Sequence, residues 1–235
     1  MTVDEVLAEL KKMGNESTKK VLMKHGAKEP FFGVKVQDLK KIVKKVKKDY
    51  ELSLQLFETG NSDAMYLAGL IADEKKMKKK DLENWAKKAY WYMLSEYTVA
   101  WVTAESPFGM ELGLEWIDSD KENISSAGWA TLGAIATYTK NEDLDLKLFE
   151  KLILRAEKDI KTAPNRTKYA INTFIISVGS YAAPLKEKCE KTAEKIGKIQ
   201  VEMGGTECKV PYAPDYIKKT VERGTLLKKK KTVRC

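Results

Sequence analysis

Apolar residues recur along most of this chain at intervals of three and four positions, with charged residues between them. That spacing places the apolar side chains on one face of a helix and the charges on the other. The pattern therefore predicts helices over nearly the whole chain. The predicted helices cover residues 3–13, 17–24, 36–48, 52–58, 64–73, 81–93, 106–117, 123–138, 143–160, 165–178, 181–196 and 216–223.

The predicted helices alternate in character. Those around 64–73, 123–138 and 169–178 carry almost no charge, whereas the helices between them are amphipathic. Helices covered on both sides alternate with helices covered on one side when helix pairs stack in a row. A pair length of about 35–45 residues suits HEAT-like units. We therefore expect one all-α domain over residues 1–235, an α-α superhelix of HEAT-like repeats.

One segment departs from the helical pattern. Residues 199–203 alternate apolar and polar positions, Gly204 and Gly205 follow, and the alternation resumes at Cys208 and Val210. Two alternating runs joined by Gly-Gly are typical of a β-hairpin. The sequence predicts one small hairpin as an insert at 198–212, followed after the last helix by a basic tail at 225–235.

Composition excludes several classes of protein. No apolar run approaches the roughly 20 residues of a membrane span, and residues 1–10 begin an acidic amphipathic helix instead of a signal peptide. The three cysteines are widely spaced and His25 is the one histidine, so no metal-site spacing occurs. We expect a cytoplasmic protein that binds no membrane and no metal.

Positive charge is concentrated near both ends of the chain. The net charge is +9, but residues 11–48 hold thirteen lysines against three acids, and residues 209–235 hold nine lysines and arginines against two. Such clustering suits a polyanion such as DNA, although solvated lysine faces would give the same count. The residues we expect to contact phosphates are Lys35, Lys40, Lys41, Lys44, Lys45, Lys228, Lys229, Lys230 and Lys231.

The run YTVAWVTAES holds the candidate chemistry. Trp101 and Glu105 are one helical turn apart, so both side chains point the same way. An aromatic face beside a carboxylate can hold a cationic or electron-poor group. The alternative is a core helix whose tryptophan packs inside while its glutamate reaches the rim. On the five residues 101–105 alone, the core helix is the favoured interpretation.

The order of several motifs resembles the bacterial DNA alkylation repair proteins of the AlkD-like type. The motifs are GVKVQDLKKIVKKV, the central Trp-rich helix, NRTKYAINTFIISVG and the basic end of the chain, and the likeness covers roughly residues 10–200. The resemblance implies a solenoid of HEAT-like repeats whose basic concave face holds duplex DNA. It also implies glycosylase activity toward N3- and N7-alkylated purines, without cofactor, from a site of two tryptophans, an aspartate and an arginine.

The resemblance transfers only part of that site. The family's Trp-x-x-x-Asp resembles Trp101 to Glu105, which makes these two the candidate catalytic residues. The family's arginine falls near Gly128, and its second tryptophan falls near Thr173. The neighbours Trp129 and Phe174, with Thr173, are the residues expected to line the pocket.

Three functions follow as hypotheses. The chain is expected to be a bacterial, nucleoid-associated DNA-binding protein of this family with a degenerate glycosylase site. The alternatives are a non-catalytic binder of duplex, damaged or branched DNA, and a helical-repeat scaffold for a protein partner. We expect a monomer and no cofactor, with double-stranded DNA, alkylated or branched, as the partner.

Overall fold

The computed structural model describes residues 1–206, 208–222 and 228–234, and within them all regular secondary structure is helical. No β-strand occurs in these residues, and none of their helices is long and apolar enough to cross a membrane. The α-helices are α1 (Val3–Met13), α2 (Glu16–Lys24), α3 (Val36–Val46), α4 (Tyr50–Glu58), α5 (Ser62–Ile71), α6 (Lys79–Lys88), α7 (Ala100–Glu105), α8 (Gly109–Trp116), α9 (Glu122–Tyr138), α10 (Leu146–Asp159), α11 (Asn165–Tyr181), α12 (Lys186–Ile196) and α13 (Ala213–Glu222). A π-helix, η1 (Met93–Val99), precedes α7, and two 3₁₀ turns are η2 (Asn141–Asp143) and η3 (Ala183–Leu185).

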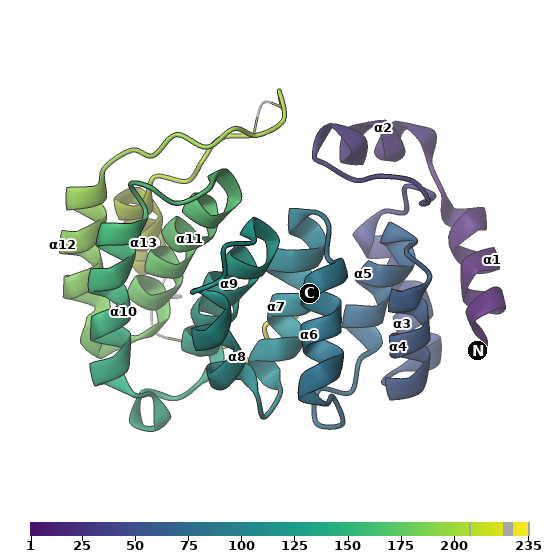
Figure 1. Cartoon of the computed structure of the whole chain (residues 1–235), viewed down its shortest axis with the longest axis horizontal. Helices are drawn as coiled ribbons and strands as arrows, with labels where there is room; N and C mark the ends of the chain where they lie inside the picture. The colour runs from purple at the N-terminus through teal and green to yellow at the C-terminus, as the bar shows by residue number, and fades with distance from the viewer. Residues whose placement is uncertain (207, 223–227, 235) are drawn as a thin grey trace.

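The helices stack side by side from α1 at one end to α12 at the other (Figure 1). Successive pairs form the row: α4 with α5, α6 with η1, α8 with α9, and α10 with α11. This arrangement confirms the predicted all-α array.

The charge-poor helices are the inner members of these pairs, as their sequences predicted. Every residue of α5 is buried, and most of α9 is buried as well. The amphipathic α10 instead buries one stripe, which includes Phe149 and Ile153. Apolar burial of this kind contributes about 25 cal/mol per Å², so the inner helices form the core of the array.

The π-helix was not predicted. The predicted helix at 81–93 in fact stops at Lys88, and the chain restarts as η1. The wider turn is visible in its hydrogen bonds, because the Thr98 hydroxyl donates to the Met93 carbonyl and the Ala100 amide donates to the Ser95 carbonyl. Single π-turns inside helices are frequently found at functional sites, and this one leads directly into α7.

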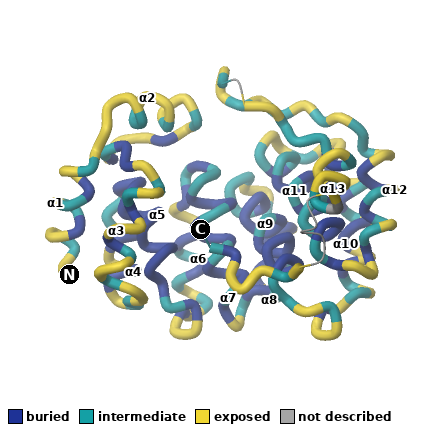
Figure 2. The backbone as a smooth tube through the Cα atoms, turned by 180° about the vertical axis from the view of Figure 1, so that it is seen from behind, coloured by how far each residue is buried: buried dark blue, intermediate teal, exposed yellow. Residues whose placement is uncertain are grey.

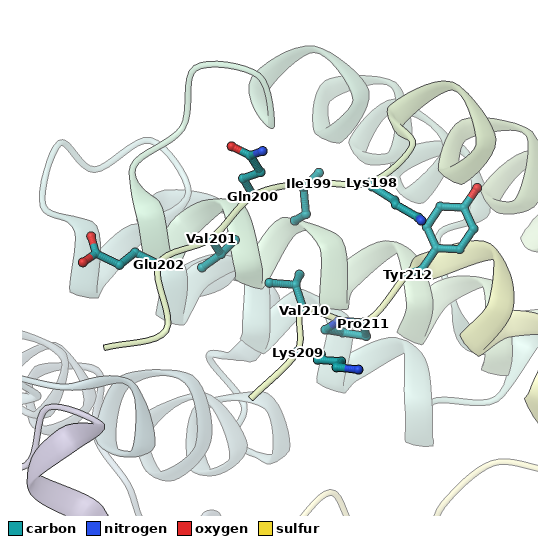
Figure 3. A pocket seen from close by; sticks show the side chains of 9 residues that line it. All are labelled: Lys198, Ile199, Gln200, Val201, Glu202, Lys209, Val210, Pro211 and Tyr212. Carbon is teal, nitrogen blue, oxygen red and sulfur yellow. The ribbon is translucent and has the colours of Figure 1, made fainter. Parts of the chain in front are cut away.

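The predicted β-hairpin at 198–212 is wrong. The chain does reverse at Gly204 and Gly205, both with positive φ, but its two arms run apart around a hollow of about 600 Å³ (Figure 3). Their backbone groups bond to α11 instead. Asn165 accepts from the Glu202 amide (2.7 Å) and donates to the Glu202 carbonyl (2.9 Å), and the Asn172 amide donates to the Pro211 carbonyl (2.9 Å).

The reversal at Gly204 meets the other end of the array. A side chain at Gly204 would place its Cβ 2.3 Å from the Lys24 carbonyl of α2, so the position requires glycine. Nearby, Cys208 Sγ lies 3.9 Å from His25 Nε2. The segment 198–212 and α2 therefore close over the N-terminal ends of the central inner helices.

Candidate functional site

Trp101 and Glu105 lie on α7, at the middle of the array. The Trp101 ring is half-buried, with the rings of Tyr97 and Tyr66 edge-on to it at centroid distances of 5.2 and 6.2 Å. Glu105 is the last residue of α7. As predicted, one helical turn puts the two side chains on the same side of α7, next to two separate hollows.

The Glu105 carboxylate is fully engaged by the end of the chain. Its Oε1 accepts from the Val233 amide (2.8 Å) and from the Thr232 hydroxyl, and its Oε2 lies 2.9 Å from Nε of Arg234. The angle at Arg234 Nε makes the last contact an ion pair without a hydrogen bond. Only 13% of the Glu105 side chain is exposed, so in this conformation Glu105 serves as an anchor for residues 232–234.

Arg234 is held from all sides. Its guanidinium donates to the carbonyls of Gly69 (3.3 Å) and Ala72 (2.7 Å) at the C-terminal end of α5, and to Glu74 Oε2 (2.6 Å). Lys48, just after α3, also donates to Glu74 at 2.6 Å. These two cations lower the pKa of Glu74 against the effect of its burial. The result is a continuous charge network from the end of α3 to the end of α7.

Residues 228–234 form an extended segment, named here the basic strap. It follows the C-terminal ends of the inner helices: Lys229 Nζ donates to the Ala136 carbonyl of α9 (2.8 Å), and the Lys230 amide donates to the Thr137 carbonyl (2.9 Å). Lys230 Nζ also lies 5.4 Å from the ring centroid of Tyr181, the last residue of α11. Figure 2 shows the end of the strap (C) over the middle of the array. Residues 225–227 of the predicted basic tail, and residue 235, lie outside the described residues.

The strap also covers a pocket of about 130 Å³ beside Trp101. Two of the predicted pocket residues, Thr173 and Phe174 of α11, line it together with Trp101, and Lys230 and Val233 of the strap line it as well. Trp129 is elsewhere: it is 1% exposed, edge-on to Phe174 at 5.1 Å, with the Arg155 guanidinium 5.9 Å from its ring. Gly128 has no room for a side chain, because a Cβ there would lie 2.7 Å from the Ile117 amide nitrogen.

A second carboxylate–guanidinium pair, whose glutamate lines the same pocket, was missed by the sequence analysis. Glu96 of η1 accepts from Arg166 of α11 through both oxygens, at 2.8 and 2.6 Å. The guanidinium lies 4.3 Å from the ring centroids of both Tyr92 and Tyr169. Burial raises the pKa of Glu96 to about 7, and the Arg166 guanidinium opposes that rise.

Residue type is the signal that could have identified these anchors. Only four of the 43 basic residues are arginines. The three that the structure describes, Arg155, Arg166 and Arg234, are each paired with a carboxylate. Arginine binds a carboxylate in a planar, two-pronged geometry that lysine cannot reproduce. A rare arginine in a lysine-rich chain therefore indicates a structural partner.

The lysines predicted to contact phosphates lie on two surfaces. Lys35, Lys40, Lys41, Lys44 and Lys45 are all exposed on or just before α3. On the strap, Lys228, Lys230 and Lys231 are exposed, whereas Lys229 is half-buried, which lowers its pKa to about 8. In the described part of the chain, no group of three or more His, Cys, Asp or Glu side chains could hold a metal.

A family model, two relatives and a solved structure match this chain. A family model described as DNA alkylation repair enzyme matches residues 6–188. The uncharacterized protein Lmo0209 of Listeria monocytogenes is 34% identical over 229 residues, covering 95% of this chain and 99% of its own length. The uncharacterized protein Lin0241 of Listeria innocua is 33% identical over the same shares.

A solved structure matches along the full length of both chains, with 37% identity and a TM-score of 0.92. It is described as a new family of proteins related to the HEAT-like repeat DNA glycosylases, with affinity for branched DNA structures. The HEAT-like arrangement of helices is therefore common to both proteins.

Proposed function

This chain belongs to the DNA alkylation repair enzyme family. We propose that it is a DNA-binding protein that prefers branched DNA and whose function does not require base excision. The branched-DNA affinity described for the structural relative supports this choice of partner. The exposed lysines of α3 supply cations for phosphates.

The observation that carries the proposal is the state of Glu105. Excision of an alkylated purine through this carboxylate would require it to face the sugar or an attacking water. Here both of its oxygens are engaged by residues 232–234, and Gly128 supplies no arginine. Residual excision would first require the strap to leave. The proposed function is therefore DNA binding by a monomer that shares the HEAT-like scaffold of its glycosylase relatives.

One assay tests binding and excision on the same sample. Labelled four-way junctions, forks and duplexes of equal length are titrated with the protein, and a 7-methylguanine duplex is assayed for released base. We expect tighter binding to the branched substrates and little or no release. Equal affinity for all substrates would refute the preference, and robust release would refute the degenerate site.

The lysines of α3 are tested against a charge-matched control. Replacing Lys40, Lys41, Lys44 and Lys45 by Ala should weaken binding to every DNA and flatten its salt dependence, since each lost phosphate contact removes about 0.9 from the slope. The control removes four exposed lysines in or just after α10, namely Lys147, Lys151, Lys158 and Lys161. Equal effects of the two variants would mean that α3 is only one solvated face among others.

A further inference from the structure

The surface beneath the basic strap is negative. The strap lies on the C-terminal ends of α5, α7, α9 and α11. The end of a helix carries roughly half a negative charge on its free carbonyls. Two carboxylates, Glu74 and Glu105, lie among these ends. Without the strap, this negative surface would repel phosphates.

The strap reverses that charge with two kinds of residue. Lys229, Val233 and Arg234 face inward and anchor it, with Val233 only 8% exposed. Lys228, Lys230 and Lys231 are exposed. All five cations of the strap lie in seven residues that contain no acid.

Lys231, one of the exposed strap lysines, borders the hollow beside Glu105. This hollow, of about 460 Å³, is lined by Lys231 and Arg234 of the strap, by Lys48, and by Glu74 and Glu105, whose carboxylates are paired with Lys48 and Arg234. Lys48 follows α3, so residues from both basic surfaces border this one hollow.

We infer that the basic strap is a phosphate-binding floor laid over the C-terminal ends of the inner helices, and that Glu74 and Glu105 are the carboxylates that hold it in place. This inference rests on the proposed DNA binding. The opposite interpretation is a plug, in which the strap occupies the place of DNA and must leave before DNA binds. Charge favours the floor over the plug. Removal of the strap would take away five cations and expose two carboxylates and four helix C-termini. The exposed negative charges would face the phosphates of DNA, and like charges facing each other disfavour association.

The first test uses Arg234→Ala. Because the Arg234 side chain is only 8% exposed, it is too buried to contact DNA itself, and this variant tests the seating of the strap. We expect affinity for a four-way junction to fall about tenfold or more at low salt, with a salt slope smaller by about 2.7 if the three exposed lysines make one contact each. The same affinity or a higher one, with the strap unseated, would overturn the floor.

A second variant leaves the anchors intact. Replacing Lys228, Lys230 and Lys231 by Gln should reproduce the smaller slope while the strap stays in place. The matched control replaces the exposed Lys147, Lys151 and Lys158 of α10 by Gln and should keep the wild-type slope. Wild-type binding by the strap variant would also overturn the inference.

Seating is measured separately from DNA binding. The amides of Lys230 and Val233 donate to Thr137 and Glu105, so their hydrogen exchange should be slow in the wild type and in the Gln variant, and fast in Arg234→Ala. Fast exchange in the wild type would refute the seated strap. Adding Glu74→Gln and Glu105→Gln to Arg234→Ala should restore part of the affinity by neutralising the bared carboxylates, and no recovery would contradict the charge argument.

The two levels of proposal fail in different ways. A wild-type protein that binds neither branched nor duplex DNA at low salt refutes the proposed function, and the floor falls with it. A wild type that binds, together with strap variants that bind equally well, refutes the floor alone.

Discussion

Each end of the inner helices has a carboxylate paired with an arginine, but the arginine is carried differently at the two ends. At the N-terminal side, Glu96 is paired with Arg166, which is part of a helix. At the C-terminal side, Glu105 and Glu74 are paired with Arg234, which is carried on an extended strap. Both guanidinium groups are buried, yet only Arg234 can withdraw without unfolding a helix. A comparable pair therefore serves as fixed structure at one end and as a reversible attachment at the other.

The largest effect should come from breaking the fixed pair. Arg166→Ala leaves Glu96 buried without its partner, and loss of one member of a buried pair costs about 3–5 kcal/mol. Urea unfolding of the wild type and the variant measures this change in the free energy of unfolding. A cost below about 1 kcal/mol would mean that water reaches Glu96 and that the pair is not fixed.

Breaking the strap pair should cost less. Arg234→Ala removes charge-assisted hydrogen bonds, but the strap can lift and let water solvate both carboxylates, so we expect a loss of about 1–2 kcal/mol. The same urea titration provides the measurement. A loss as large as that of Arg166→Ala would erase the difference between the two ends.

Raising the pH should increase the contribution of Lys229 to the free energy of unfolding. Burial lowers the pKa of Lys229 from its ordinary 10.5 to about 8, while Glu142 opposes the change. Between about pH 8 and 10.5 the unfolded chain therefore binds more protons at this site than the folded chain, and the contribution of Lys229 to stability rises with pH. The stability of the wild type relative to Lys229→Met should increase from pH 7 to pH 10. A flat or falling difference would contradict the assigned burial.

The smallest expected effect is on the labelling rate of Cys208, which lies at the end of the inner helices opposite the strap. Cys208 is exposed near His25, whereas Cys189 is buried and its pKa is raised to about 12 by burial. In a Cys235→Ser background, a thiol reagent should label Cys208 quickly and Cys189 only on unfolding. Adding Arg234→Ala should leave the Cys208 rate unchanged. A faster rate would show that release of the strap loosens the opposite end.

The local pattern of residues was enough to predict the array of helices, but it did not predict the contacts of the candidate site. Periodicity identified the helices, and the lack of charge identified the inner ones, because an inner helix is covered by its neighbours on both sides. It also placed Trp101 and Glu105 on one side of α7, because that relation spans a single turn. The partner of Glu105 is Arg234, 129 positions later in the chain, and no local pattern contains that contact.

The two misjudged segments have the same origin. The Gly-Gly reversal at 204–205 was real, but Asn165 and Asn172 bind the backbone of the arms in place of a paired strand. The π-helix likewise depends on the widened turn between Met93 and Thr98, which hydrophobic spacing does not encode. In both cases the outcome depends on hydrogen bonds that the pattern of apolar residues does not contain.

The strap also changes how the whole array should come apart. A row of helix pairs touching only its neighbours behaves as a one-dimensional stack, in which end units can melt before the middle. Residues 228–234 instead contact α5, α7, α9 and α11 at once. That link ties units that are not adjacent, so the loss of one is felt by the others. We therefore expect the seated strap to couple the units at the centre of the solenoid, and its release to make the unfolding transition less steep.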